Sequence, residues 1–180
     1  MTLNDYLNKM CGGGESPTRV GLKEIGWSML GSFMGIGSCC YLSVLYFEPR
    51  DMTLIIASFG ASAVLIYSAV RSPLAQPRNL IGGHMLSAII GVACYQLLGG
   101  SWYSAALAVS CAIAVMLLTG TLHPPGGATA LLAVTGSAQI HKLGFLYVLT
   151  PVGLGAFIML GIALAINNLS LSRKYPEYWF

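Results

Sequence analysis

The sequence predicts an all-α integral membrane protein with six membrane segments, arranged as two inverted three-segment repeats with broken or half helices at the centre. Apolar residues make up 56% of the 180 residues, charged residues only 8%, and the mean hydropathy is +0.73. Long apolar runs alternate with short polar breaks, and one motif occurs twice. An ordinary soluble domain has roughly a quarter charged residues, so much of this surface must face lipid.

Both ends of the chain are more polar than its middle, and we expect them to be tails at 1–23 and 167–180. The first of these contains charges of both signs before any apolar run begins. It resembles neither a secretory signal peptide nor an Arg- and Ser-rich transit peptide. We therefore expect the protein in a bacterial inner (plasma) membrane as a multi-pass protein.

Five apolar runs are long enough to cross a bilayer, which takes about 20 residues of helix. A sixth run, Gly126 to Val134, is too short to span and directly follows His123-Pro124-Pro125. Proline fixes the start of a helix because its missing N–H would have had no partner there. We expect a broken helix at this point. The five long runs are Trp27 to Phe47, Met52 to Val70, Leu80 to Leu98, Trp102 to Thr119 and Gly144 to Ile166.

An internal repeat organises these segments. The letters GASAVL at 60–65 recur as GATALL at 127–132. The repeat divides the membrane part into units at 24–98 and 99–166, each with three segments. An odd number of crossings inverts the second unit, and inverted repeats with interrupted helices are a common construction of transporters.

The positive charges predict the orientation. If all six segments cross, the side with both tails and the 71–79 loop carries seven Lys and Arg residues, against two on the other side. Positive charges collect on the cytoplasmic side, so both termini are expected there. Re-entrant middle segments would instead turn Arg71 and Arg78 outward. The seven are Lys9, Arg19, Lys23, Arg71, Arg78, Arg173 and Lys174; the two are Arg50 and Lys142.

The two repeated motifs predict a substrate site. The first turn of a helix has unpaired N–H groups and a partial positive charge, so it attracts anions. Inverted symmetry would point two such helix starts at each other near the bilayer midplane. The alternative is that the glycines serve only close helix packing. The candidate binding residues are Ser58, Gly60, Ala61, Ser62, His123, Gly126, Gly127, Ala128 and Thr129.

A second polar cluster follows at 71–84. Arg71 and Arg78 lie in a proline-containing loop, with Asn79 and His84 just beyond. These four residues are a candidate vestibule, because a basic funnel raises the local concentration of anions. Alternatively, the arginines only set the topology, and His84 makes a structural hydrogen bond to a neighbouring helix.

The sequence lacks the residues that several kinds of activity require. No acidic residue lies well inside the apolar runs, which argues against a cation pump. We find no catalytic motif and no metal-binding cysteine spacing, so we expect neither an enzyme nor a cofactor or metal. A minor alternative is an intramembrane enzyme or redox protein using His84, His123 and Cys94 or Cys111.

Four motifs in order resemble the HPP family of integral membrane proteins, over about residues 26–166. They are SFGASA at 58–63, SPLAQPRN at 72–79, GGH at 82–84 and HPPGGATA at 123–130. Members in cyanobacteria and plastids are associated with nitrite transport. The resemblance thus implies that the substrate is a small inorganic anion. The free N–H groups expected at the two helix starts also favour an anion.

The leading hypothesis is therefore a transporter or channel for a small monovalent anion, with nitrite as the named candidate. The alternative is a non-transporting membrane scaffold or assembly protein. The expected partners are the anion, the lipid bilayer and further copies of the chain in a homodimer or other homo-oligomer. We expect no nucleic acid.

Overall fold

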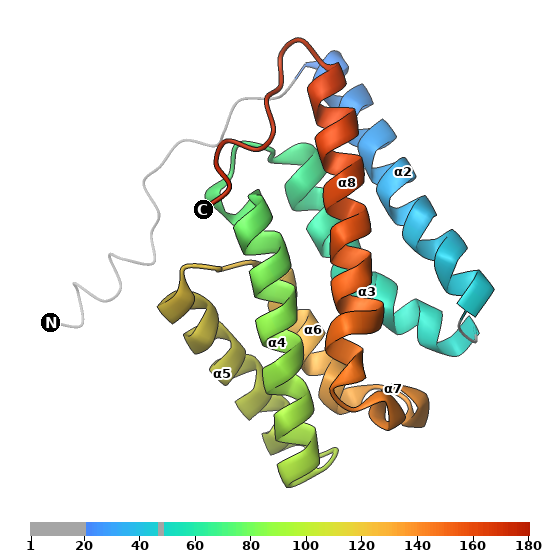
Figure 1. Cartoon of the computed structure of the whole chain (residues 1–180), viewed down its shortest axis with the longest axis vertical. Helices are drawn as coiled ribbons and strands as arrows, with labels where there is room; N and C mark the ends of the chain where they lie inside the picture. Colours follow the sequence, from blue (N-terminus) through green and yellow to red (C-terminus); the bar gives the residue numbers. More distant parts are fainter. Residues whose placement is uncertain (1–20, 47–48) are drawn as a thin grey trace, which may run out of the picture.

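A computed structural model describes residues 21–46 and 49–180. Most of the predicted N-terminal tail, at 1–20, and Phe47 at the end of the first predicted span lie outside the described residues. The described part is helical and contains no strand (Figure 1). In chain order the elements are α2 (Leu22–Tyr46), α3 (Pro49–Ser68), η1 (Pro73–Ala75), α4 (Pro77–Leu98), α5 (Trp102–Thr119), α6 (Pro124–Thr135), α7 (Ala138–Leu143), η2 (Val148–Gly153) and α8 (Leu154–Leu169).

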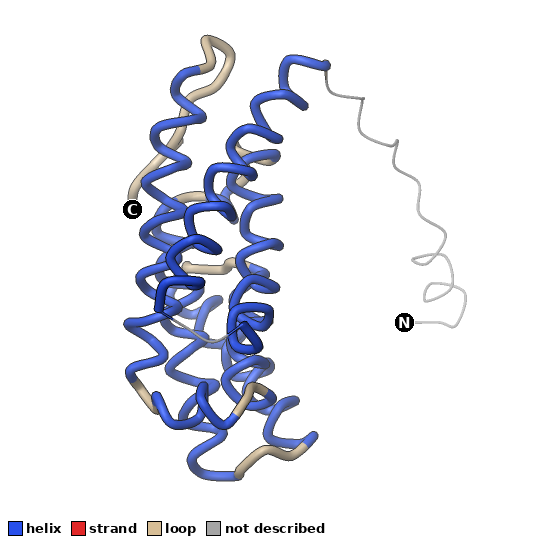
Figure 2. Tube along the Cα trace, turned by 90° about the vertical axis from the view of Figure 1, so that its right-hand side faces the viewer, coloured by secondary structure: helices blue, strands red, loops and turns tan. Residues whose placement is uncertain are grey.

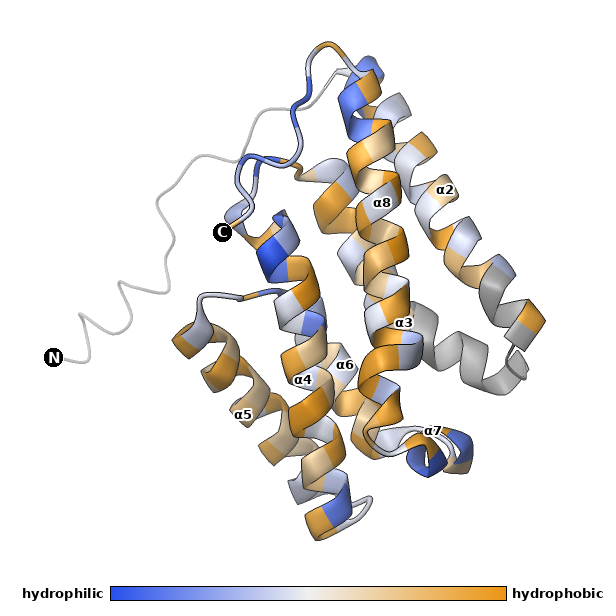
Figure 3. Cartoon of the chain, viewed as in Figure 1, coloured by the Kyte–Doolittle hydropathy of each residue, from blue (hydrophilic) through white to orange (hydrophobic). Residues whose placement is uncertain are grey.

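The helices run up and down a single elongated bundle. The start of α2 and the end of α8 lie together at one end, which we call the tail end, and α7 lies at the other (Figure 1). Seen from the side, the helices run roughly parallel to the long axis (Figure 2). Hydrophilic residues concentrate at the C-terminal tail, at the start of α4 and in α7, whereas apolar residues predominate along the long helices (Figure 3).

Three helical stretches of the described residues are long and apolar enough to span a membrane: Pro77–Leu98, Trp102–Thr119 and Val148–Leu169. They correspond to the last three predicted spans, and the fourth predicted span has the same bounds as α5. The expected all-α membrane protein is thus confirmed at this level. Helix α6 has 12 residues and begins at Pro124, directly after the extended His123, as the Pro-Pro pair predicts.

The first repeat contains no such break, and here the prediction was wrong. Helix α3 continues from Pro49 through Gly60 to Ser68, so no helix starts at Gly60. The motif at 60–65 lacks the prolines that precede its copy, and proline is what ends a preceding segment. The sequence analysis also missed a break before α8. Thr150 has extended backbone angles (φ −142°, ψ 124°) because the residue before a proline is pushed out of the helical region.

Glycines allow α4 and α6 to pack closely, and this contact determines where the site forms. A Cβ atom on Gly91 would lie 2.6 Å from the Ala130 carbonyl oxygen. On Gly83 it would lie 2.5 Å from the Cβ of His123. The linker 120–123 therefore lies directly against α4, and Asn79 Nδ2 donates to the Leu122 carbonyl at 2.9 Å.

Candidate functional site

Four polar side chains meet in the interior of the bundle. Ser62 comes from α3, His84 from α4, and His123 and Thr129 from the start of α6; each is 0% exposed. We call these four residues the histidine network. Ionisable side chains buried within a membrane bundle are rare and usually functional, which makes this network the candidate site.

Short hydrogen bonds join the network into one chain. Ser62 Oγ lies 2.7 Å from His84 Nε2 and 2.8 Å from His123 Nε2, so it bridges the two rings. His84 Nδ1 lies 2.7 Å from Thr129 Oγ1, and His123 Nδ1 lies 2.7 Å from the carbonyl oxygen of Leu74 in η1. The ring centroids are 5.0 Å apart.

The direction of every bond in the chain follows from the acceptor at its end, the carbonyl oxygen of Leu74. A carbonyl oxygen only accepts, so His123 donates from Nδ1 to Leu74, and in the neutral ring Nε2 accepts from the Ser62 hydroxyl. Ser62 has a single proton, so His84 Nε2 must donate to Ser62 Oγ. The remaining His84 Nδ1 then accepts from Thr129. All four bonds point from Thr129 toward Leu74.

Neighbouring groups fix the network in place. Phe59 contacts the His84 ring edge-on, with centroids 5.3 Å apart. Tyr147 donates to the Thr129 carbonyl at 3.3 Å. Two further carbonyl acceptors lie one helical turn before the hydroxyls: Ser58 O is 3.2 Å from Ser62 Oγ, and Pro125 O is 3.4 Å from Thr129 Oγ1.

The sequence-predicted binding residues divide into two groups. Ser62, His123 and Thr129 come together in the network, and Ser58 contributes its carbonyl. The others point elsewhere. Gly60 is half-buried, Ala61 is exposed on α3, Gly126 packs against α4, and Gly127 and Ala128 line an apolar groove beside α5.

The expected anion site at free helix N–H groups is not found. Gly60 to Ser62 lie inside α3, where N–H groups pair within the helix. At the start of α6, Pro124 and Pro125 have no N–H, and Gly126 donates to the His123 carbonyl at 2.8 Å. Residues from Gly127 onward follow the first turn. The same prolines that fix this helix start therefore remove its free donors.

The four residues of the predicted vestibule do not form one entrance: two are buried and two are exposed. His84 belongs to the buried network, and Asn79, 5% exposed, holds the 120–123 linker, so neither lines an open entrance. Arg71 and Arg78 are exposed. Arg78 donates to the Thr119 carbonyl at the end of α5, where a cation favourably meets the helix dipole.

The groove beside α5 has a volume of about 510 Å³ and almost entirely apolar walls. It lies on the outer side of α6, whereas the network lies on the side that packs against α3 and α4. In a membrane its apolar lining suits a lipid chain rather than an anion. Its lining residues are Val109, Ile113, Met116, Leu122, Pro124, Gly127, Ala128 and Leu131.

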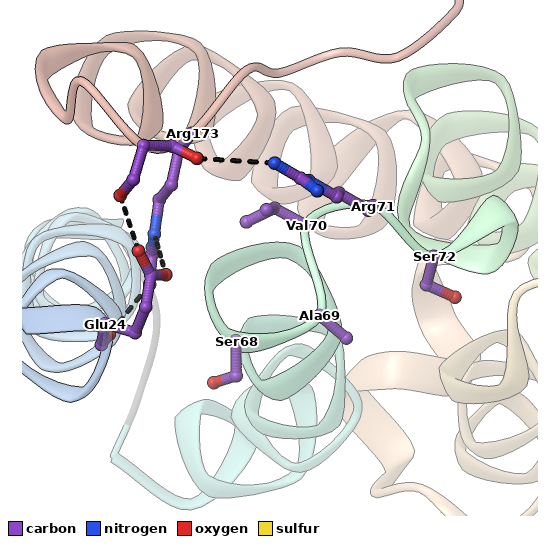
Figure 4. A pocket seen from close by; sticks show the side chains of 8 residues that line it. Glu24, Ser68, Ala69, Val70, Arg71, Ser72 and Arg173 are labelled. Atoms are coloured by element: carbon purple, nitrogen blue, oxygen red, sulfur yellow. Dashed lines mark hydrogen bonds and ion pairs between the residues drawn. The ribbon is translucent and has the colours of Figure 1, made fainter. Parts of the chain in front are cut away.

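A second polar cluster, which the sequence analysis missed, ties the C-terminal tail to the bundle. The Arg173 side chain is 2% exposed and donates from Nε to Glu24 at 2.7 Å (Figure 4). It also donates to the carbonyls of Tyr67 and Glu24 and to Asn167. Ser172 binds the other Glu24 oxygen at 2.6 Å. No local pattern marks a tail arginine as buried, because its partners Glu24 and Tyr67 lie 149 and 106 residues away.

Known proteins resemble nearly the whole chain. Residues 17–176 match the model of a family described as HPP, transmembrane region. Two Dictyostelium discoideum proteins, each described as a transmembrane protein, are 45% and 43% identical to it over 179 and 189 aligned residues.

Those alignments cover 97% and 100% of this chain but 57% and 65% of the relatives, so the chain spans less than two thirds of their length. No solved structure matches. The family match includes every residue of the histidine network and every helix of the described bundle. The chain therefore belongs to the HPP family of transmembrane proteins.

Proposed function

We propose that this protein carries a small monovalent anion across its membrane, with nitrite as the leading candidate. The observation that carries the proposal is the histidine network, in which two imidazoles and two hydroxyls lie at 0% exposure inside an apolar bundle. Burying such groups is costly unless they are fully hydrogen-bonded, and membrane proteins retain them where substrates or ions pass.

The chemistry of the network suits an anion better than a cation. Among the described residues, the hydrogen-bond and ring partners of the two histidines include no carboxylate that would attract a cation. The Ser62 and Thr129 hydroxyls and the imidazole N–H groups can turn toward an anion. The proposed substrate site is therefore the histidine network and not the two helix starts. All four side chains are buried, so transport requires α3, α4 and α6 to separate locally.

The proposed architecture remains two inverted repeats, 24–98 and 99–166, with both termini on the cytoplasmic side. In support, α2 starts and α8 ends at the tail end (Figure 1), and there Arg173 binds Glu24 while Arg71 donates to the Ser172 carbonyl. A periplasmic reporter enzyme fused after Phe180 and expressed in a bacterium should be inactive. An active reporter would contradict this orientation. The bacterial inner membrane stays a prediction, and the relatives from Dictyostelium do not support it.

We also propose that the protein acts as a homo-oligomer, with a dimer as the default, and has no enzymatic activity. The observation in favour is the exposed apolar surface of α5, which includes Leu107, Ile113, Leu117 and Leu118. Such a surface faces either lipid or a second copy. A monomer mass in mild detergent would count against the oligomer.

The direct test is anion uptake into sealed proteoliposomes, compared for nitrite, nitrate, chloride and formate. We expect saturable nitrite uptake above that of protein-free liposomes, and a loss of uptake in Thr129→Val, which keeps the side-chain shape but removes the hydroxyl. Ser110→Ala is the matched control, because Ser110 is exposed on α5 and bonds only its own helix.

A scaffold without transport is the second candidate. The observation that favours it is the tight contact of α4 and α6, where a Cβ atom on Gly126 would lie 2.7 Å from Ser87 Oγ and 2.8 Å from the Gly83 carbonyl. If the folded wild-type protein moved none of the four anions, the scaffold would replace the transporter.

A further inference from the structure

Beside each hydroxyl of the histidine network lies a backbone carbonyl that the neutral form does not use as an acceptor. In the neutral form Ser62 donates to His123 and Thr129 donates to His84. The carbonyls of Ser58 and Pro125 nevertheless lie 3.2 and 3.4 Å from these hydroxyl oxygens. Each hydroxyl can therefore turn its proton from an imidazole nitrogen to a carbonyl without any heavy atom moving far.

These acceptors matter once a proton is added. A protonated His84 donates from Nδ1 to Thr129 Oγ1, and the Thr129 hydroxyl turns to the Pro125 carbonyl. A protonated His123 donates from Nε2 to Ser62 Oγ, and the Ser62 hydroxyl turns to the Ser58 carbonyl. In both cases every donor keeps an acceptor. This satisfies the main requirement for placing an imidazolium in a dry site.

We propose that the histidine network accepts one proton and passes it between His84 and His123 through Ser62, so that the anion is carried together with a proton. The coupling of the proton to the anion rests on the proposed anion transport. The proton transfer between the two histidines rests only on the geometry of the network. A proton beside the anion also makes the pair neutral, which lowers the cost of bringing either charge into the bundle.

The transfer balances at every atom. A proton binds His84 Nδ1 and displaces the hydrogen bond from Thr129. The Nε2 proton of His84 moves to Ser62 Oγ while the Ser62 hydroxyl proton moves to His123 Nε2. His84 is then neutral and His123 is an imidazolium.

His123 can next release its Nδ1 proton to water from the side of Leu74, a half-buried residue between α3 and α4. Hydroxyl and ring rotations restore the starting pattern. The chain of bonds thus leads from the core of α6 to the loop segment at 71–76.

The surroundings contain little that would hold the proton permanently. Among the described residues, α3 presents Phe59 and Ser62 to the rings, α6 presents Thr129, and η1 presents the Leu74 carbonyl. Tyr147, before η2, is the other titratable group at the network, and it binds the Thr129 carbonyl. None of these partners is a carboxylate or a fixed cation, so the proton can leave as readily as it arrives.

Proteoliposomes with an entrapped pH indicator provide the test. An inward nitrite gradient should acidify the interior above the rate in protein-free liposomes, which accounts for diffusion of the undissociated acid. A pH gradient of one unit, acidic outside, should support about a tenfold nitrite accumulation. Nitrite uptake that ignores the pH gradient and moves no protons would overturn the proton inference and leave anion transport intact.

A second measurement separates the two proposals if anion transport fails. A potassium gradient with valinomycin drives protons in the absence of any transported anion. Proton flux without anion flux would support the relay and overturn the proposed transport, whereas absence of both fluxes from folded protein would overturn both. Ser62→Ala removes the bridge and should abolish the proton flux, Ser62→Thr keeps the hydroxyl and should restore it, and Ser110→Ala should match the wild type.

Discussion

Arg173 donates from its Nε atom to a carboxylate oxygen of Glu24 at 2.7 Å, and this bond ties the C-terminal tail to the start of α2. The arginine also binds the backbone carbonyl of Tyr67, at the end of α3, at 3.0 Å. One side chain thus holds three helices together, because Asn167 of α8 is a further partner at 3.1 Å.

Replacing Arg173 by Met should therefore destabilise the tail end of the bundle. A hydrogen bond that involves a charged group contributes about 1.5–3 kcal/mol to stability. This contribution is lost when the charged group is removed and its buried partner is left without a hydrogen bond. The carboxylate of Glu24 is partly exposed and can be hydrated, so we expect a net loss of about 2–3 kcal/mol. Lys174→Met, at the exposed neighbouring position, is the control. Equal unfolding temperatures of the two variants in detergent would contradict this role.

The same contact predicts a pH dependence. The hydrogen bond from Ser172 and that from Arg173 lower the pKa of Glu24 below its ordinary value of 4.5. A lowered pKa in the folded state means that the contribution to stability is present above pH 4.5 and declines as the pH falls through the folded pKa. Wild-type stability should fall more steeply below pH 4.5 than that of Glu24→Gln. Parallel curves for the two proteins would show that Glu24 makes no such contribution.

Two adjacent glycines should respond differently to the same substitution. In Gly126→Ala the new Cβ would lie 2.7 Å from Ser87 Oγ and 2.8 Å from a backbone oxygen, so α4 and α6 must separate. In Gly127→Ala the nearest atom is Val109 Cγ1 at 3.9 Å. We expect a loss of folded protein only in the first variant. The second should be neutral or stabilising by up to about 1 kcal/mol, since alanine favours helix. Similar yields and thermal stability of both variants would refute the close packing.

The tautomers of the three histidines can be read by nitrogen NMR on labelled protein at neutral pH. The hydrogen bonds assign a proton to Nδ1 of His123 and to Nε2 of His84. His141 binds the Val134 carbonyl through Nε2 at 3.2 Å, so it should also carry its proton there. His141→Gln identifies the third signal. A spectrum in which His84 and His123 have the same tautomer would refute the directed chain.

The sequence predicted those elements whose signals are local. The bounds of Trp102–Thr119 follow from an apolar run between a serine cap and a glycine, and Pro124 marks the start of α6. The repeat of GASA as GATA suggested a second helix start at Gly60, but small residues alone do not end a helix. Pro151 is the local signal for the break before α8, because it pushes Thr150 out of the helical region.

The site was only partly predictable, for a different reason. Ser62, His123 and Thr129 were identified from their motifs. For His84 the sequence left two roles open, an entrance or a hydrogen bond to a neighbouring helix, and the structure shows the second. The partners of His84 lie 22 and 45 residues away, and their meeting depends on how closely Gly83 lets α4 approach the linker. Crossing distance and helix rotation are properties of packing that a single sequence does not contain. The burial of Arg173 depends on the same kind of long-range contact.

The common direction of the four hydrogen bonds also gives the network an electric polarity. Their dipoles add, and the passage of one proton leaves the bonds among Thr129, His84, Ser62 and His123 pointing the opposite way. A voltage across the membrane acts on such a reversible dipole in proportion to its component along the bundle axis. Two states of the site can therefore differ in their response to membrane potential while every helix stays in the same place.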